Sequence, residues 1–204
     1  MKSTHKISSW CIVENDSVIL NGEKLFHSEG EAFPDFIKGA YRHFGMSYPK
    51  FFKMDSLSKL AFLSAELLLK DIVKEETENN IAIVFANQSA SLDTDVKYQE
   101  SIADREDYFP SPAVFVYTLP NICIGEISIR YKLNSENAFF VFDEFNADFI
   151  SNYANSLIDT QKADKVLCGW VEYYQGNYKA FLYLVEADGA WAHQTETINT
   201  IYNQ

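Results

Sequence analysis

The sequence predicts a layered α/β domain, and three observations support this prediction. Strand-like and helix-like stretches alternate along the whole chain, as they do in sheets that are covered by helices. One apolar run, residues 81–86, contains no polar side chain, which is typical of a central strand buried on both faces. The chain has 204 residues, of which 47% are hydrophobic and 15% aromatic, enough to build one sizeable core. We therefore expect residues 1–204 to form a single domain.

Five stretches are predicted to be the main strands of the sheet: residues 7–12, 81–86, 138–142, 165–174 and 178–186. The last two are separated by Gln175-Gly176-Asn177, a turn signal that predicts a hairpin. A further short strand is expected at residues 18–20, before the turn signal Asn21-Gly22.

Helical periodicity predicts three helices between these strands. The strongest begins near Asp55 or Ser56, either of which can cap it, and carries apolar side chains at helical spacing up to residue 69. Other helices are expected at residues 33–44 and 145–161. From Asp188 onward the sequence is mostly polar, and we expect only a short excursion or a frayed end there.

The charge and hydropathy of the chain exclude two classes of partner. The formal net charge is −12 and the isoelectric point is about 4.7. Such a surface repels the phosphate backbone, so no nucleic-acid partner is expected. No apolar run approaches the roughly 18–20 residues that span a bilayer, so no membrane association is expected either.

Cysteine usage and the N-terminus predict a cytoplasmic protein. Cys11, Cys123 and Cys168 are widely spaced, odd in number and set in apolar runs, as reduced core cysteines are. The first residues lead into only a short apolar stretch without a small-residue cleavage site, unlike a secretory signal. The four histidines show no metal-ligand spacing, and no nucleotide-binding or serine-hydrolase motif occurs. We therefore predict no metal and no cofactor.

Three segments of the sequence contain extended motifs, each of about 10 to 16 residues. Residues 51–61 read F-F-K-M-D-S-L-S-K-L-A, residues 118–133 read T-L-P-N-I-C-I-G-E-I-S-I-R-Y-K-L, and residues 163–172 read A-D-K-V-L-C-G-W-V-E. In this order they resemble segments of the β-ketoacyl-[acyl carrier protein] synthases, the condensing enzymes of fatty-acid and polyketide biosynthesis. The chain departs from the family pattern where Ser135-Glu136 replaces a Gly-Pro pair and where Trp170 replaces a second glycine.

The resemblance covers about residues 48–186 and implies a fold. The chain is similar to the N-terminal half of the thiolase-like fold, a layered structure with a mixed, mainly five-stranded sheet and helices on both faces. Residues 118–133 would form the family's substrate-tunnel helix. The histidines that promote decarboxylation in the family lie in the C-terminal half, which we expect to be outside this chain.

The acyl-accepting cysteine of the family is missing. Counting from Asn137 places Glu144 at its position, give or take one residue. A carboxylate cannot form the thioester that defines condensation in this family. Glu144 can instead cap the following helix, together with Asp143, or mimic a charged state, as a glutamine does at this position in the chain-length-factor subunits of type II polyketide synthases.

These departures predict a non-condensing, ketosynthase-like accessory subunit in a fatty-acid, polyketide or aryl-polyene type pathway. Ketosynthases pair through the strand before the nucleophile, so the resemblance assigns Phe139, Phe140 and Phe142 to a dimer interface. The partner would be a second copy or a full-length ketosynthase. Acyl carrier protein is a possible further partner, although the net charge opposes its docking unless a local basic patch exists.

Two alternatives remain open. The chain can be a decarboxylase or thioesterase that acts on carrier-protein thioesters through Glu144. It can also be an acyl-ligand binding module, using residues of the former tunnel, which are Phe115, Asn121, Ile122, Ile124 and Ile127; most of these would equally fill a core. Cys123, inside the same helix, is predicted to be a core residue rather than a substitute nucleophile.

Overall fold

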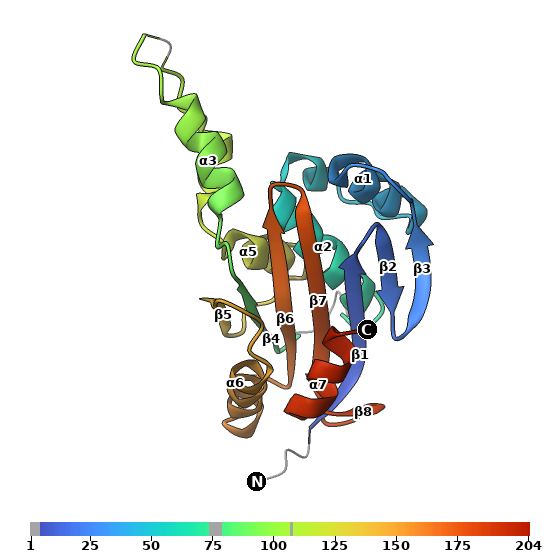
Figure 1. The fold of residues 1–204 in the computed structure, drawn as a ribbon. Coiled ribbons are helices and arrows are strands. Elements are labelled where there is room, and N and C mark those ends of the chain that lie inside the picture. The colour runs from blue at the N-terminus through green and yellow to red at the C-terminus, as the bar shows by residue number, and fades with distance from the viewer. Residues whose placement is uncertain (1–4, 74–78, 107) are drawn as a thin grey trace.

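The computed structural model describes residues 5–73, 79–106 and 108–204. These residues form one mixed eight-stranded sheet and the helices around it. The strand order is β3-β2-β1-β7-β6-β4-β5, and β8 pairs with β1. Helices cover both faces of the sheet (Figure 1). The predicted layered α/β fold class is confirmed. Residues 1–4, part of the stretch considered above as a secretory signal, lie outside the described residues.

The strands are β1 (Lys6–Glu14), β2 (Ser17–Leu20), β3 (Glu23–His27), β4 (Ile81–Asn87), β5 (Asn137–Val141), β6 (Lys165–Tyr174), β7 (Asn177–Glu186) and β8 (Trp191–Ala192). All five predicted main strands are present, and so is the short strand at residues 18–20. The sheet is nevertheless larger than the predicted five strands, because β3 and β8 were missed. β3 is short and largely polar and β8 has two residues, so neither carries an alternating pattern that identifies it.

Strand direction places three carboxyl ends together. β4 is parallel to both β5 and β6, so these three strands end at the same end of the sheet. β6 and β7 form the predicted antiparallel hairpin, and Gln175 and Gly176 both have positive φ in its turn, as a tight hairpin requires. The sheet continues through β1 and β2 to β3. β3 and β5 are therefore the edge strands at the two ends of this order, and the two-residue β8 is a further edge strand beside β1.

Three helices cover one face of the sheet: α1 (Phe33–His43), α2 (Ser56–Leu69) and α5 (Ile122–Tyr131). A short 3-10 helix, η1 (Pro49–Lys53), precedes α2. Asp55 caps α2 as predicted, because its Oδ1 accepts a hydrogen bond from the N–H of Ser58 at 2.8 Å. Helix α2 is buried around most of its circumference, which explains why its apolar side chains are not confined to one stripe.

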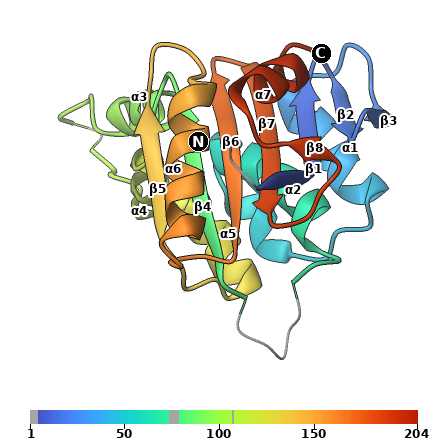
Figure 2. The same ribbon diagram turned by 90° about the horizontal axis from the view of Figure 1, so that it is seen from below.

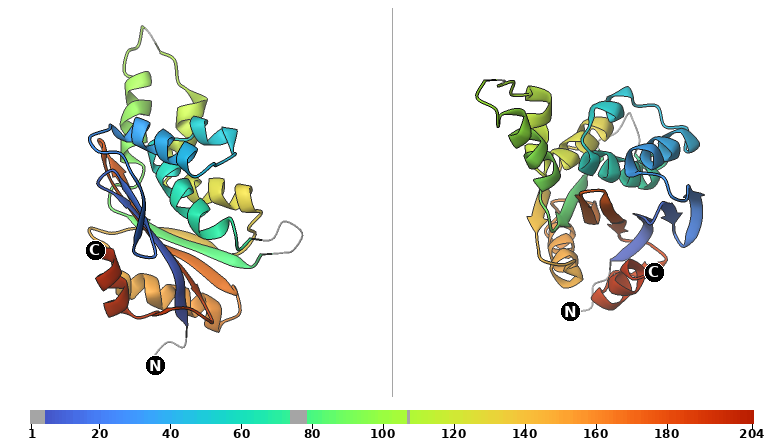
Figure 3. Two further views of the ribbon diagram at one scale, coloured as in Figure 1. Left: turned by 90° about the vertical axis from the view of Figure 1, so that its right-hand side faces the viewer. Right: turned by 45° about the horizontal axis from the view of Figure 1, so that its top comes forward.

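The opposite face carries α6 (Ala147–Asp159) and α7 (Thr195–Tyr202). These two helices lie beside each other over a second hydrophobic core (Figure 2), and Figure 3 shows the helices on the two sides of the sheet. The expectation of a frayed end after Asp188 is wrong. Ile198 and Ile201 of α7 are buried in this core, and two apolar residues in a polar tail are too few to show helical periodicity in the sequence.

A helical arm projects from the body of the molecule (Figure 1). We call residues 92–106 and 108–119 the arm; it contains α3 (Leu92–Ser101), α4 (Pro112–Phe115) and the 3-10 helix η2 (Val116–Thr118). The sequence did not predict α3, because most of its side chains are polar or charged. Helix α3 packs mainly against α4 and η2 and makes only a smaller contact with β6 of the sheet, so a long buried apolar stripe is not needed.

The structure explains why residue 169 is a glycine in the A-D-K-V-L-C-G-W-V-E segment, residues 163–172. Its φ is +147°, and a Cβ atom there would lie 1.9 Å from the carbonyl oxygen of Phe181 on the neighbouring strand. No side chain fits that space. The next residue, Trp170, is accommodated because its side chain lies on the other face, in the second core.

None of the single helices in the described residues is long and apolar enough to span a membrane. The segments Pro112–Thr118 and Ile122–Tyr131 reach that length and hydropathy only together, and they are bent by 100° relative to each other.

His193 is a buried histidine that links the C-terminal segment to the body. It is 1% exposed, its Nδ1 lies 2.9 Å from Oδ1 of Asn155 on α6, and its Nε2 has no hydrogen-bond partner among the described residues. Burial lowers the pKa of His193 to about 4, and the neighbouring His5 lowers it too. His193 is therefore neutral in the fold at pH 7.

We expect the free energy of unfolding to fall as the pH drops from about 6.5 to about 4. The unfolded chain protonates His193 near pH 6.5, whereas the folded chain resists protonation down to about pH 4, so the unfolded state binds more protons in this window. The loss from this one group is about 3 kcal/mol. Urea unfolding between pH 4 and pH 7 measures it. The His193→Gln variant is expected to lose this part of the pH dependence. The control variant His27→Gln, at an exposed position, is expected to keep it. Equal pH dependence of unfolding in both variants would refute the assignment to His193.

Candidate functional site

A pocket lies at the carboxyl ends of the parallel strands, the end of an α/β sheet at which ligands commonly bind. Its volume is about 660 Å³. It is lined by Gln88 after β4, by Asp143, Glu144 and Phe145 after β5, by Trp170 and Glu172 of β6, by Asn177, Tyr178 and Lys179 of β7, and by Asn199, Tyr202 and Asn203 at the end of α7. Glu144, the predicted site residue, therefore faces a pocket to which strands from the middle of the chain and the C-terminal helix α7 contribute.

Glu144 is exposed in the turn between β5 and α6. The strand–turn–helix context predicted for it is present, but it does not cap the helix. Asn146 is the cap, because its Oδ1 accepts a hydrogen bond from the N–H of Phe149 at 2.9 Å. The alternative in which Asp143 and Glu144 cap α6 is therefore wrong, and their carboxylates are left facing solvent and the pocket.

Two further groups shape the pocket floor. The Oε2 of Glu172 accepts hydrogen bonds from the N–H groups of Gln88 at 2.7 Å and Ser89 at 3.1 Å, which fixes the turn after β4. The Nζ of Lys179 donates to the carbonyl oxygen of Tyr202 at 2.9 Å and lies 4.2 Å from the centre of the Tyr202 ring. Lys179 thus holds the end of α7 over the pocket.

The pocket is acidic. Lys179 is already paired with Glu14, at 2.9 Å. Burial raises the pKa of Tyr202, and three nearby carboxylates, those of Glu14, Glu172 and Glu144, raise it further. No histidine or cysteine is among the described residues that line the pocket. The arrangement can accept a proton on a carboxylate, but it presents no thiol for acyl transfer.

Sequence reasoning found only part of this site. Glu172 is the last residue of the A-D-x-x-L-x-G-x-x-E pattern, and Trp170 is the residue that departs from it, so both carried a signal. Lys179 and Tyr202 come from a hairpin strand and from the tail, and no spacing in the sequence relates them to Glu144.

All three cysteines are buried away from this pocket. Cys11, Cys123 and Cys168 are at most 1% exposed and form no disulfide. Burial raises the pKa of the Cys11 thiol to about 12 and also raises the pKa values of Cys123 and Cys168. The prediction that Cys123 is a core residue is confirmed, since it packs in the core between α5 and α2.

We expect no thiol of the folded protein to react rapidly with a thiol reagent at pH 8. Attack requires the thiolate, and burial removes both access and the charged form. Titration with an aromatic disulfide is expected to show no fast phase in buffer and three equivalents in 6–8 M urea, because unfolding exposes all three cysteines. A fast equivalent in the folded protein would show that one cysteine remains a candidate nucleophile.

The five predicted ligand-binding residues do not converge on one of the described pockets. Ile124 and Ile127 are buried in the first core, and Ile122 packs against it. Asn121 is exposed at the start of α5, and Phe115 is 57% exposed on the arm. An acyl-binding role for these residues stays a prediction.

Of the predicted interface residues, Phe139 and Phe140 lie on the edge strand β5, and Phe142 directly follows it. Phe139 packs toward the first core. Phe140 and Phe142 point to the other face, where the Phe140 ring lies 4.8 Å from that of Phe149 and 5.3 Å from that of Tyr153. Phe149 of α6 is itself partly exposed beside this edge, and the sequence did not single it out. The aromatic edge is therefore wider than predicted.

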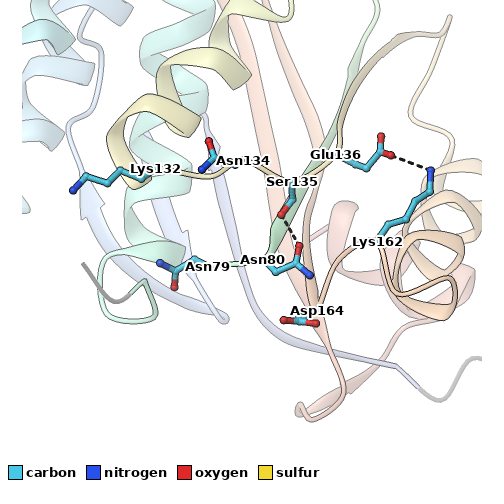
Figure 4. A pocket seen from close by; sticks show the side chains of 8 residues that line it. All are labelled: Asn79, Asn80, Lys132, Asn134, Ser135, Glu136, Lys162 and Asp164. Carbon is cyan, nitrogen blue, oxygen red and sulfur yellow. Dashed lines mark hydrogen bonds and ion pairs between the residues drawn. The ribbon is translucent and has the colours of Figure 1, made fainter. Parts of the chain in front are cut away.

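A second, polar pocket of about 620 Å³ lies at the opposite end of the parallel strands (Figure 4). Its lining balances two lysines against two carboxylates, and Lys162 is already paired with Glu136 at 2.9 Å. Ser135 Oγ donates to Asn80 Oδ1 at 2.6 Å. Across the part of the chain that the structure describes, no group of three or more His, Cys, Asp or Glu side chains is arranged to hold a metal ion.

Solved structures show where this fold occurs. A structure described as the ishigamide ketosynthase/chain length factor matches with a TM-score of 0.63 and 16% identity, over 89% of this chain and 62% of that chain. The ketosynthase ApeO in complex with its chain length factor ApeC, from Xenorhabdus doucetiae, contains a chain that matches with a TM-score of 0.61 and 12% identity, over 100% of this chain and 91% of that chain. A β-ketoacyl synthase from Burkholderia phymatum matches with a TM-score of 0.60 and 14% identity, over 91% of this chain and 59% of that chain.

The chain thus spans about three fifths of the length of two of these chains and nearly all of the third. No family model and no curated protein matches its sequence. At these identities the likeness concerns the fold, and the fold is the thiolase-like fold of ketosynthases and chain length factors.

Proposed function

We propose that this protein is a non-condensing accessory subunit that pairs with a ketosynthase in fatty-acid, polyketide or aryl-polyene type biosynthesis. One observation carries the proposal. The turn between β5 and α6, where the resemblance places the acyl-accepting cysteine, presents the exposed pair Asp143-Glu144, and every cysteine of the chain is buried elsewhere. A subunit of this fold without a reactive thiol can still shape and stabilise a partner's site.

The open edge of the sheet supports pairing through β5. Strand β5 hydrogen-bonds to β4 on one side only, so its other side offers unpaired backbone groups to a partner strand. Val141 in this strand is 53% exposed. An uncovered edge with apolar side chains is an aggregation risk for a free chain, and a permanent partner removes that risk.

The arm extends this surface. It lies on the same side of the molecule as β5 (Figure 2) and carries most of the large exposed apolar side chains of the described residues, among them Leu92, Val96, Tyr108, Phe109, Phe115, Val116 and Leu119. Phe109 is 76% exposed. Clustered exposed apolar side chains mark interaction surfaces in soluble proteins.

A ketosynthase is a better partner than a second copy. Two copies would each bring a net charge of −12 and an exposed acidic turn at the end of the pairing strand, and like charges across an interface oppose association. The solved structures of this fold include a ketosynthase in complex with its chain length factor. Another is described as a type II acyl-carrier protein in complex with its ketosynthase, so we extend the proposal to a carrier protein that docks on the assembled pair.

Intact-mass spectrometry and product analysis test the non-condensing role. The chain is incubated alone with malonyl- and acyl-loaded carrier protein, and then again with its ketosynthase. Alone, it is expected to gain no acyl group and to release neither carbon dioxide nor free acid. With the ketosynthase it is expected to change the amount or length of the product. An acyl adduct on the isolated chain contradicts the proposal.

The enzymatic alternative has one observation in its favour, which is the position of Glu144 in a 660 Å³ pocket beside Lys179 and Tyr202. Under this alternative the isolated chain releases carbon dioxide from malonyl carrier protein or free acid from acyl carrier protein. Glu144→Ala would abolish that release, whereas Glu100→Ala on the exposed side of α3 would not. Under the accessory role neither variant has activity to lose, so the same assay separates the two functions.

A further inference from the structure

A third pocket, distinct from the Glu144 pocket, lies between the body and the arm. Its volume is about 280 Å³. The body contributes Lys53 and Met54 next to η1 and Asp55, Ser56 and Lys59 at the start of α2, and the arm contributes Thr94 and Lys97 of α3, Ala113 and Val114 of α4 and Tyr117 of η2. Three lysines thus meet an apolar wall made by Met54, Ala113 and Val114.

The acidic groups around this pocket are already engaged. Asp55 accepts the N–H of Ser58 on Oδ1 and the hydroxyl of Thr94 on Oδ2, at 2.8 and 2.9 Å. Burial raises the pKa of Asp55, and these hydrogen bonds counteract the rise only in part. Deeper inside, Glu126 accepts the hydroxyl of Tyr117 at 3.0 Å and pairs with Lys50 at 2.7 Å. Both carboxylates are thus engaged within the protein, although Asp55 still acts electrostatically on Lys59.

Positive charge is concentrated here against the trend of the whole chain. The chain has 17 basic and 29 acidic residues, yet Lys38 and Lys97 both lie close enough to Lys59 to act on it electrostatically. Burial lowers the pKa of Lys59; Asp55 raises it, and Lys38 and Lys97 lower it again. Lys97 pairs with Asp93. Among the described residues, Lys53 and Lys59 form no ion pair with a carboxylate.

We propose that this pocket binds a small organic anion, a phosphate ester or carboxylate whose apolar body rests on Met54, Ala113 and Val114 and whose anionic head is held by Lys53, Lys59 and Lys97. A concave site with an apolar wall and a few convergent polar groups is the common form of a small-molecule site. Lysines of one sign around a cleft focus their potential into it and favour an anion. The ligand offsets the mutual repulsion of these ammonium groups.

Such a ligand ties the arm to the body. Near this pocket the Asp55–Thr94 and Tyr117–Glu126 hydrogen bonds join the arm to the body. Ser91 Oγ donates to the carbonyl oxygen of Thr118 at 2.8 Å, which closes the base of the arm. An anion that contacts Lys59 of the body and Lys97 of the arm adds a further bridge. Binding therefore reduces amide hydrogen exchange in α3 and α4.

Calorimetric titration of the isolated chain with three probes tests the proposal. Phenyl phosphate carries both the head and the body, inorganic phosphate carries the head alone, and benzyl alcohol carries the body alone. Phenyl phosphate is expected to bind more tightly than inorganic phosphate, and benzyl alcohol to bind most weakly. Binding of both anions is expected to weaken as salt rises from 0.05 to 0.5 M, because salt screens partly exposed charges. Benzoate in place of phenyl phosphate distinguishes a carboxylate ligand from a phosphate ester.

Two variants and one control locate the binding. Lys59→Gln and the more exposed Lys53→Gln are each expected to weaken phenyl phosphate binding roughly tenfold, the effect of one charge-assisted hydrogen bond. Lys24→Gln removes the same charge from the exposed edge strand β3 and is expected to change nothing. The proposal is overturned if no anion gives a heat of binding or slows amide hydrogen exchange in α3 and α4. It is also overturned if all three variants weaken phenyl phosphate binding equally. Because no ketosynthase is present, neither outcome bears on the accessory role.

Discussion

Val141→Lys is expected to weaken pairing with a ketosynthase by more than roughly a hundredfold. Val141 is 53% exposed in the free chain, so lysine is tolerated there before pairing. In the complex the ammonium group would lie within the strand-to-strand contact, where an unpaired buried charge costs several kcal/mol. Light scattering of the mixed proteins measures the effect. The unchanged chain is expected to give the mass of the complex with the ketosynthase, and Val141→Lys is expected to give the masses of the two free proteins.

Two companion variants separate interface from fold. Phe140→Lys is expected to abolish the complex as well, but also to lower the melting temperature, because Phe140 packs against Phe149 and Tyr153. Phe52→Lys introduces the same charge at a 48% exposed position on η1, away from the edge, and is expected to leave the complex intact. If Val141→Lys or Phe140→Lys leaves the mass of the complex unchanged, β5 is not the pairing strand.

Glu66→Ala is expected to lower the free energy of unfolding by about 3 kcal/mol. Glu66 of α2 is 6% exposed and accepts the hydroxyl of Tyr131 at 2.6 Å. It also pairs with Arg130 at 3.2 Å, which lies over the ring of Tyr48. Removing the carboxylate leaves a guanidinium and a phenol without their partner between α2 and α5, and such groups are costly to bury alone.

Urea denaturation at pH 7 measures this loss. The estimate is at the low end of the range for buried pairs, because the Arg130 side chain is 32% exposed and water can partly replace the lost partner. Glu66→Gln keeps the shape and one acceptor, so a loss of about 1–2 kcal/mol is expected. Glu100→Ala on the exposed side of α3 serves as control and is expected to cost less than about 0.5 kcal/mol. Equal stability of the Glu66 and Glu100 variants would show that the network contributes nothing.

The central layers of the fold were predictable because their sequence patterns agree with their burial. Strand β4 is an unbroken apolar run and is buried at every position. Helix α2 is capped by Asp55, one of the two cap residues that the sequence offers, and ends where its apolar pattern ends. The hairpin between β6 and β7 turns at Gln175 and Gly176, both with positive φ, and Gly176 adopts this conformation without strain. In each case local preference and tertiary packing require the same structure.

The periphery was not predictable because tertiary contacts decide it. Helix α7 is held by Ile198 and Ile201 and by Lys179 at its last turn, and Lys179 lies on a different element. Helix α3 packs mainly on other parts of the arm, so its polar sequence shows no long apolar stripe. In both helices the local sequence preference is weak, and tertiary packing determines the structure.

Glu144 was the one lining residue of the candidate site that the sequence assigned to a site, although Glu172 and Trp170 lie in one of the quoted sequence patterns. Counting from the tunnel-type helix placed Glu144 in the turn after β5, and the structure has it in that turn. The same helix could not reveal which of its residues face a cavity. Ile124 and Ile127 face the core, whereas Phe115 lies on a separate short helix on the arm, and sequence spacing does not distinguish a tunnel wall from a filled core.

The most direct test of the accessory role is the composition and mass of the complex that the tagged chain forms in its native cell. The chain is purified under mild conditions, its partners are identified by mass spectrometry, and the mass of the assembly is measured by light scattering. The proposed function predicts a full-length ketosynthase in a one-to-one ratio with this chain. Recovery of the chain alone, or as a dimer of itself, would contradict that function.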